Sequence, residues 1–236
     1  MKIRAISIVA VFCASFIPAL AQESDDDQTV TELYLQSQIK VQVIRAEAAD
    51  PDRDMKLIAL DDVESLLAED PGNADILEVL RDLAGEGVTT VVREQGHVIN
   101  NFPDVRARAA EVLGQQGSER AAEELATMLL TDPEPMVMST AIQAIAGIEI
   151  EDDEARGKRD RAMAAAIYRQ TAVNKDNTFA YRYLDAVETI ANREGRLSDP
   201  MVLEEVAKIA NARNGYNRAV RERAYTLLRT LSGTGQ

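Results

Sequence analysis

The sequence is poor in the residues on which most enzymes and β-proteins depend. Among its 236 residues there is no Trp, one Cys and one His, and aromatic residues make up 4%. β-Sandwiches and β-barrels are built from strands rich in aromatic and β-branched residues, so the composition argues against both. Ala, the strongest helix former, occurs 35 times. We therefore expect an all-α protein.

The single His and the single Cys restrict the chemistry open to the chain. Structural and catalytic zinc sites draw several ligands from Cys and His, and a hydrolase triad needs a His beside its nucleophile. His97 alone cannot supply either kind of site. No phosphate-binding loop of the G-x-x-x-x-G-K-[ST] or G-x-G-x-x-G type occurs. The sequence therefore predicts no catalytic residues, no metal site and no cofactor.

The first residues have the pattern of an export signal. Lys2 and Arg4 precede an apolar stretch, residues 5–20, and the segment 19–21 (Ala-Leu-Ala) fits a small-x-small cleavage site. The apolar stretch is too short for a comfortable membrane span. We expect residues 1–21 to be a signal peptide, residues 22–28 a disordered acidic lead-in, and the mature chain to have no transmembrane segment. Such a chain would be periplasmic or associated with the cell envelope.

Charge is distributed unevenly along the chain, whose formal net charge is −14. Residues 22–154 contain 31 acidic and nine basic residues, whereas residues 155–236 contain nine acidic and 15 basic residues. Binding to nucleic acid depends on neutralising phosphates with a basic surface. The excess of acidic residues in residues 22–154 therefore argues against nucleic acid as a partner. We expect a protein partner, which is either a different protein or another copy of this chain.

One helix pattern returns along the chain. It consists of an apolar residue, an Ala four residues later and a second apolar residue after four more. Its four copies are Met55, Ala59 and Val63; Val105, Ala109 and Leu113; Val137, Ala141 and Ile145; and Val220, Ala224 and Leu228. An Asp or Asn stands five residues before the first three copies, as Asp50, Asn100 and Asp132. A small central residue allows stacked helices to approach to about 8–10 Å. The recurrence predicts an α-solenoid of stacked antiparallel helix pairs.

We expect the solenoid to cover residues 29–236 and to carry an irregular insertion near residues 84–102. The first two copies of the pattern are 50 residues apart and the next two are 32 apart, so extra residues must lie between the first two. The segment 88–92 (Val-Thr-Thr-Val-Val) has the composition of a strand. Because a lone short strand without a partner is unstable, we expect a helical or irregular conformation there.

At these residues the sequence resembles the second helix of a HEAT repeat, and above all the short HEAT-like repeats of bacteria. Residues 100–148 carry the resemblance well, and residues 50–67 and 215–231 carry it moderately. The order of the helical segments along the whole chain also resembles that of exported HEAT-repeat proteins of bacteria with periplasmic flagella. Short segments such as residues 101–106 and 135–137 carry this resemblance. The resemblance implies the solenoid fold.

The resemblance also implies a role for two polar positions of the pattern. In HEAT repeats the Asp and the Arg form ladders between neighbouring repeats. Asp132 and Arg106 fit these roles, and Arg221 follows Val220 as Arg106 follows Val105. Met138 stands where an Arg is expected, so the ladder should be interrupted there.

As a function, the resemblance implies a non-catalytic module that binds or scaffolds proteins. Two alternatives stay open. One is a lyase- or hydroxylase-like enzyme of the HEAT class, although such hydroxylases use paired His-Glu steps and this chain has only His97. The other is a structural subunit of an envelope assembly or a flagellum-associated assembly.

Tyr and Arg residues are interleaved in the C-terminal part. Five of the six Tyr lie after residue 167. Tyr and Arg are enriched at the energetic centres of protein interfaces. We therefore predict that a partner contacts Tyr181, Arg182, Tyr216, Arg218, Arg223 and Tyr225. The alternative is that individual Tyr rings fill the core of a helical stack that has few Phe residues.

The cleavage pattern makes a first testable prediction. If the Ala-Leu-Ala segment is cleaved, the exported protein begins at Gln22. The intact mass of protein recovered from the periplasmic fraction should correspond to residues 22–236. A mass that includes Met1 would contradict the assignment.

Overall fold

The computed structural model describes residues 30–173 and 175–233. The chain divides into two units, residues 1–38 and residues 39–236, and each is described by itself. In the first unit, residues 30–38 form the beginning of a helix. The expected signal peptide and acidic lead-in lie outside the described residues. Everything below concerns the second unit.

Ten helices and one small hairpin make up the described chain. The helices are α1 (Val30–Ala49), α2 (Arg53–Glu69), α3 (Ala74–Ala84), α4 (Pro103–Gln116), α5 (Glu119–Thr131), α6 (Pro135–Gly147), α7 (Asp153–Val173), α8 (Asn177–Glu194), α9 (Met201–Ala210) and α10 (Arg218–Gly233). The strands β1 (Arg93–Glu94) and β2 (His97–Val98) lie between α3 and α4, and a short 3-10 turn, Ala212–Asn214, precedes α10.

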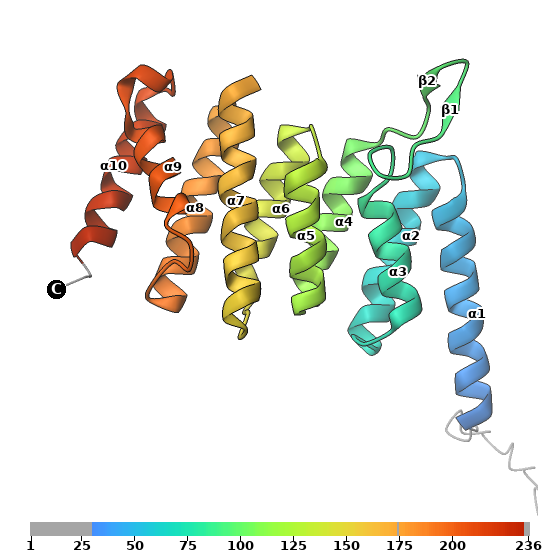
Figure 1. The fold of residues 1–236 in the computed structure, drawn as a ribbon. Coiled ribbons are helices and arrows are strands. Elements are labelled where there is room, and N and C mark those ends of the chain that lie inside the picture. The colour runs from blue at the N-terminus through green and yellow to red at the C-terminus, as the bar shows by residue number, and fades with distance from the viewer. Residues whose placement is uncertain (1–29, 174, 234–236) are drawn as a thin grey trace, which may run out of the picture. The chain divides into compact units, whose positions relative to one another are not determined.

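From α2 onward the helices stack in two layers (Figure 1). Layer B consists of α2, α4, α6, α8 and α10, each packed against the next. Layer A consists of α3, α5, α7 and α9, and in it α5 packs on α7 and α7 on α9. Consecutive helices alternate between the layers. This is an all-α HEAT-like solenoid, and it confirms the fold class expected from the sequence.

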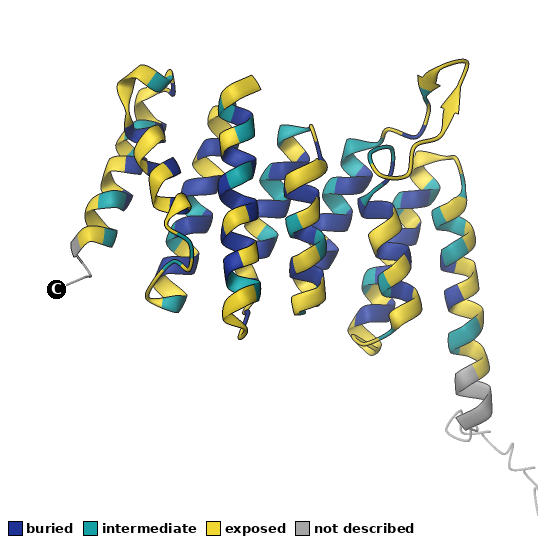
Figure 2. Cartoon of the chain, in the orientation of Figure 1, coloured by how far each residue is buried: buried dark blue, intermediate teal, exposed yellow. Residues whose placement is uncertain are grey.

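The recurring sequence pattern occupies one register of layer B. Its three apolar positions are the third, seventh and eleventh residues of a helix. The residue at the seventh position is Ala, whose small side chain leaves room for neighbouring helices to pack closely. Figure 2 shows the buried residues concentrated where the helices face one another. The residues at the seventh position, all 0% exposed, are Ala59, Ala109, Ala141 and Ala224.

Most outer positions of the pattern are buried, and one position in each end helix of layer B is less so. Leu113 and Ile145, the eleventh residues of α4 and α6, are 2% and 0% exposed. Met55 and Leu228 belong to the first and last helices of the layer, and both are only partly buried. A helix at the end of a stack has a neighbour in its layer on one side only, so part of its apolar face stays accessible.

Helix α8 follows the same register with larger residues. Its third, seventh and eleventh residues are Phe179, Tyr183 and Val187, and all are 0% exposed. The Tyr183 hydroxyl donates a hydrogen bond to the Val202 carbonyl in α9, at 3.0 Å. Burial raises the pKa of Tyr183 well above its ordinary value. The pattern with a central Ala does not reveal this fifth copy, because Tyr replaces the Ala.

Local side chains fix where several helices begin. Asn73, Ser118 and Asp176 each accept a hydrogen bond from the amide three residues ahead, at 3.2, 3.1 and 2.7 Å respectively. Such caps satisfy amide groups that have no partner within the helix. Pro103 and Pro135 begin α4 and α6, at a position where no amide hydrogen is needed. These helix starts therefore depend on local sequence signals.

The insertion between α3 and α4 comprises residues 85–102 and differs in part from expectation. Residues 88–92 form no named strand, as expected, but the hairpin β1–β2 follows where helical or irregular structure was expected. Its turn residues Gln95 and Gly96 have φ of 49° and 86°. A two-residue hairpin turn of this hand needs positive φ at both residues. Gln takes this conformation rarely, so only Gly96 signals the turn in the sequence.

One buried amide fastens the insertion. Asn100 is 6% exposed. Its Oδ1 accepts from the Val92 amide at 2.9 Å, and its Nδ2 donates to the Thr90 carbonyl at 2.7 Å and to Glu86 Oε1 at 2.9 Å. A Cβ at Gly87 would lie 2.4 Å from the Asn100 carbonyl oxygen, so only glycine fits there. The segment is therefore held in one conformation by a few specific contacts.

The closest approach in layer B gives a prediction on stability. A Cβ at Gly114 in α4 would lie 2.8 Å from Ala144 Cβ and 3.2 Å from Ala144 Cα in α6. Ala favours the helix over Gly by about 1 kcal/mol, but overpacking costs about 1–3 kcal/mol. We expect Gly114→Ala to lower the melting temperature measured by circular dichroism.

The matched control is Gly147→Ala near the end of α6, where an added Cβ would meet nothing within 4 Å. This variant should melt at the wild-type temperature or above it. Equal melting temperatures for the two variants would mean that α4 and α6 do not approach as closely as described.

Candidate functional site

The predicted partner-binding residues lie in α8, in α10 and in the turn that precedes α10. Four of them reach the surface. Tyr181 and Tyr225 are 41% and 57% exposed. Arg182 is exposed, and so is Arg218, which pairs with Glu222 one turn later at 2.6 Å.

Two of the predicted residues are engaged within the fold, which corrects the prediction. Tyr216 is 4% exposed, and its hydroxyl lies 2.6 Å from Thr171 Oγ1, so it fills the core. Arg223 bridges two carboxylates of α8, donating to Asp185 Oδ1 at 2.9 Å and to both oxygens of Glu188. The hydrogen bonds from Glu188 and Asp185 raise the pKa of Arg223 above its ordinary value.

The bridge made by Arg223 is one of two equivalent ion pairs in layer B. Arg223 is the sixth residue of α10, and Arg108 is the sixth residue of α4. Arg108 reaches back to Asp61 and Glu64 of α2, at 3.0 and 2.5 Å. In both cases the acids are the ninth and twelfth residues of the preceding layer B helix. These arginines therefore hold neighbouring repeats together.

Arg182 occupies the same helix position but has no such partner. It is the sixth residue of α8, and the ninth and twelfth residues of the preceding helix α6 are Gln143 and Ala146. Neither carries a charge. No ion pair or hydrogen bond of the Arg182 side chain occurs among the described residues. The Tyr181–Arg182 pair therefore presents an exposed ring and an uncommitted guanidinium on layer B.

A separate, buried ladder pair lies between α4 and the start of α6. Arg106 Nε donates to Asp132 Oδ2 at 2.6 Å, and both side chains are nearly inaccessible. The Arg106 Nη1 also donates to the Glu86 carbonyl at 3.0 Å and to Asn101 Oδ1 at 2.9 Å. Breaking a buried pair of this kind typically costs about 3–5 kcal/mol. These contacts tie the insertion to the central repeats.

In α6 and α10 the residues equivalent to Arg106 are Met138 and Arg221, and neither forms a buried ion pair of this kind. Met138, the equivalent of Arg106 in α6, is 0% exposed, and Gln170 Nε2 of α7 donates to its sulfur at 3.1 Å. The neighbouring Arg169 donates to the Leu129 and Asp132 carbonyls at the end of α5, at 3.0 and 2.7 Å. In α10, the Arg221 Nε is buried without a hydrogen-bond partner among the described residues.

The second feature that could bind a partner is a cavity beneath the insertion, which we call the insertion pocket. Its volume is about 450 Å³. It is lined by Arg45, Ala48, Ala49, Lys56, Glu78, Val79, Asp82, Leu83, Glu86, Thr90, Val92 and Asn100. The sequence predicts an irregular insertion here but does not predict this cavity, because the lining comes from four separate segments.

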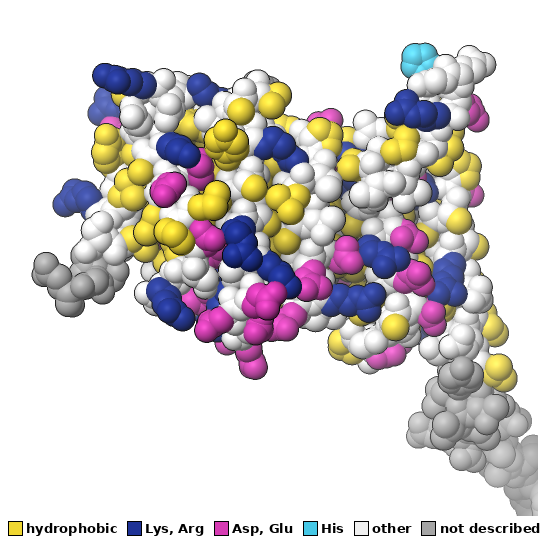
Figure 3. Space-filling model, viewed as in Figure 1, with side chains coloured by type: hydrophobic (Ala, Val, Ile, Leu, Met, Phe, Trp, Pro, Cys, Tyr) yellow, Lys and Arg dark blue, Asp and Glu magenta, His cyan; other side chains and the backbone are white. Residues whose placement is uncertain are grey.

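A shallower groove runs between α5 and α7 on the layer A face. Its volume is about 610 Å³, and small apolar side chains such as Ala126 and Ala162 line it together with Glu123, Glu124, Lys158 and Arg161. Burial raises the pKa of Glu124. Figure 3 shows acidic and basic side chains interspersed on this face. The groove lacks the enclosed, buried polar groups of the insertion pocket.

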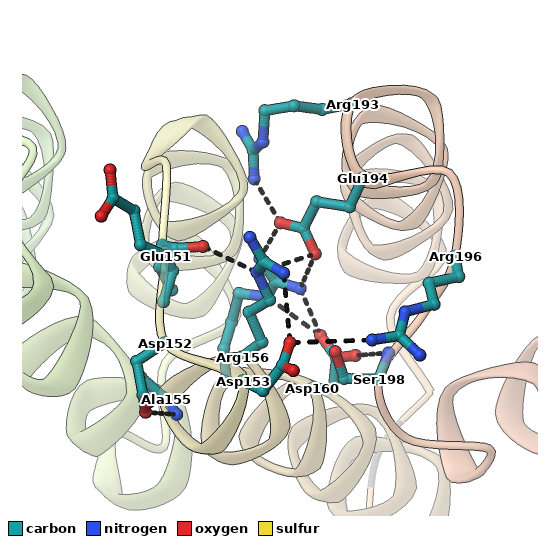
Figure 4. A network of polar contacts seen from close by, with 12 residues as sticks. Glu151, Asp152, Asp153, Ala155, Arg156, Asp160, Arg193, Glu194, Arg196 and Ser198 are labelled. Atoms are coloured by element: carbon teal, nitrogen blue, oxygen red, sulfur yellow. Dashed lines mark hydrogen bonds and ion pairs between the residues drawn. The ribbon is translucent and has the colours of Figure 1, made fainter.

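A network of charged side chains around Arg159 is structural (Figure 4). Arg159, 1% exposed, donates to Asp160 and to Glu194 of α8, at 2.8 and 2.6 Å. Asp160 Oδ2 accepts from the amides of Ser198 and Asp199 ahead of α9, at 2.7 and 3.2 Å. The cluster thus joins α7, the end of α8 and the start of α9, and its central carboxylates are already engaged.

Within residues 30–173 and 175–233, no group of three or more His, Cys, Asp or Glu side chains is arranged to hold a metal ion. None of the described helices is both long and apolar enough to cross a membrane. His97 is exposed in the hairpin.

The cluster around Arg159 predicts a pH-dependent stability. Burial raises the pKa of Glu194, but hydrogen bonds from Arg159 and Arg193 outweigh it and lower the pKa below its ordinary value. The ionised carboxylate therefore stabilises the fold above the unfolded-state pKa, and this contribution is lost as the pH falls through the lower folded-state pKa. We expect Glu194→Gln to cost about 2 kcal/mol at pH 7, measured by urea unfolding.

The difference between Glu194→Gln and wild type should shrink as the pH falls below about 4. The control is Glu154→Gln, an exposed partner of Lys158 on α7, which should change the unfolding free energy by less than about 0.5 kcal/mol. A pH-independent difference for Glu194→Gln would rule out the ionised carboxylate as its cause.

Comparison with known proteins bears on the centre of the chain. Residues 98–156 match the family model described as HEAT repeats. No curated protein matches the chain. The matched segment runs from β2 into α7 and contains the Arg106–Asp132 pair. The central helices are therefore similar to HEAT repeats, which commonly mediate protein interactions, and the same two-layer stacking continues on both sides of them.

Proposed function

We propose that this chain is an exported, non-catalytic protein-binding module that acts as a scaffold in the periplasm or the cell envelope. The observation that carries the proposal is the exposed Tyr181–Arg182 pair, whose guanidinium lacks the carboxylates that bind its equivalents. The central match to HEAT repeats supports a protein-interaction role. The pattern of residues 1–21 supports export.

The chemistry of the pair indicates what a partner offers to it. Arg binds carboxylates through two parallel hydrogen bonds, and a neighbouring Tyr adds a rigid amphipathic surface. On α6, the preceding helix of layer B, Met136 is 52% exposed. An uncommitted Arg needs no internal ion pair to be broken before it binds. We therefore expect a partner segment with an exposed Asp or Glu and an apolar neighbour.

The test compares two arginines at the same helix position. Arg182→Gln should leave the melting temperature unchanged, because no internal contact is lost. Arg223→Gln should lower it by about 2–4 °C, because it removes a bridge between α8 and α10. Partner binding is measured in intact cells with a photo-cross-linking amino acid at Tyr181. A control places the same cross-linker at Ala207, exposed on α9 of layer A.

A protein adduct should form from position 181 and not from position 207. Arg182→Gln should reduce the yield of the adduct at least about tenfold, because truncating one partner of a buried interface charge pair typically costs about 2–5 kcal/mol. Equal adducts from both positions, or an adduct unaffected by Arg182→Gln, would contradict the proposed surface. A chromophore or a metal that copurifies with the protein in stoichiometric amount would contradict the non-catalytic assignment.

A further inference from the structure

We propose that the insertion pocket binds the side chain of a Lys or Arg residue presented by a partner protein. This inference rests on the proposed protein-binding function and places a second contact site far from Tyr181 along the stack, between α1, α2, α3 and the insertion.

The pocket has an apolar wall and a polar floor. Ala48, Ala49, Val79, Leu83 and Val92 form the wall. The floor contains Lys56, Glu86 and Asn100, which are 4%, 8% and 6% exposed. Long basic side chains bury their methylene groups against apolar surface while their charged end finds polar partners. The combination of wall and floor suits such a side chain.

The buried carboxylate on the floor is only half engaged. Glu86 Oε1 accepts from Asn100 Nδ2 at 2.9 Å and lies 3.4 Å from Lys56 Nζ. Lys56 Nζ also donates to the Ala48 carbonyl at 2.7 Å. Glu86 Oε2 has no hydrogen-bond partner among the described residues. A second cation can therefore bind this oxygen without displacing Lys56.

The charges around the pocket favour a cation. Its lining contains three acids, Glu78, Asp82 and Glu86, and two basic residues, Arg45 and Lys56. Arg45 is engaged by Asp75 at 2.7 Å and by Glu78 at 3.8 Å. Arg81 lies 3.5 Å from Glu78 and 3.7 Å from Asp82. Among the described residues, Glu86 is the acid of the lining whose carboxylate has no Arg partner. Residues 39–102 as a whole contain 14 acidic and six basic residues. The negative end of the α3 dipole also points toward the insertion.

The shape of the pocket is fixed before any ligand binds. Asn100 holds the insertion through three hydrogen bonds, and Arg106 holds the Glu86 carbonyl from α4. A preformed pocket saves the ordering cost that a flexible loop would incur on binding. Its volume of about 450 Å³ lies in the range of sites that enclose a small group.

The experiment measures binding of fluorescein-labelled hexa-arginine amide to the purified mature chain by fluorescence anisotropy at low salt. The comparison peptide is hexa-citrulline, which has the same shape without the charge. Three variants are compared with wild type. Glu86→Gln removes the floor carboxylate, Ala49→Phe fills the cavity without changing charge, and Glu94→Gln removes an acid from the hairpin that does not line the pocket.

Glu86→Gln should weaken binding of hexa-arginine about tenfold, because it removes one charged contact. Ala49→Phe should weaken binding to a similar extent, because the added ring occupies the space that the basic side chain would enter. Glu94→Gln should leave it within about twofold, and hexa-citrulline should bind far more weakly. Because Ala49 is exposed, Ala49→Phe should fold even if Glu86→Gln does not, as circular dichroism will show. Equal losses for Glu86→Gln and Glu94→Gln, with none for Ala49→Phe, would overturn the pocket and leave only diffuse attraction to an acidic surface.

Two further outcomes distinguish the insertion pocket from a small-cation site and from the Tyr181–Arg182 surface. Free agmatine binding as tightly as the peptide would make this a site for small cations and would overturn the partner-protein assignment. An adduct at Tyr181 without peptide binding at the pocket would overturn this inference alone, whereas peptide binding without the adduct would overturn the Tyr181–Arg182 surface alone.

Discussion

Close packing between neighbouring helices of layer B is the constraint on which the rest of the structure depends. Four of its five helices place an Ala at the seventh position, and Gly114 meets Ala144 where a side-chain carbon would clash. Small residues at the contact bring two backbones together, and every further contact between the repeats follows from that spacing. The sixth-position arginines reach the preceding helix only because it is so near.

Most arginines of layer B that are discussed above stabilise the fold through ion pairs, whereas Arg182 has no internal ion pair. Arg106, Arg108 and Arg223 are each matched by carboxylates at defined positions. Arg182 occupies the same helix position as Arg108 and Arg223, but the facing positions of α6 carry no carboxylate. An isolated sequence motif cannot show this difference, because the carboxylates that engage an Arg are distant in the sequence. They lie 26 positions ahead of Arg106 and 35 to 47 positions before Arg223 and Arg108.

The fold could be predicted from the sequence, whereas the site could be predicted only in part. The helix starts depend on Asn73, Ser118, Pro103 and similar local signals, and the repeat depends on Ala at one spacing. Tyr181, Arg182, Arg218 and Tyr225 were predicted to contact a partner, and their exposure leaves them accessible to one. The fate of Tyr216 and Arg223 is decided by tertiary neighbours, Thr171 and Asp185 with Glu188. The insertion pocket could not be predicted because its lining converges from distant segments.

Because helices contact only near neighbours in the stack, the native contacts of this chain are local in sequence. Among the described residues, two hydrogen bonds span the greatest separation in sequence, 47 residues each. They run from Arg108 to Asp61 and from Arg193 to Ala146. Loops of this size close at a small entropic cost, and no strand must wait for a distant partner. The chain can therefore fold progressively from its N-terminal end during synthesis. Each new helix pair docks on a surface already formed, and little apolar surface is left to aggregate while the remainder emerges.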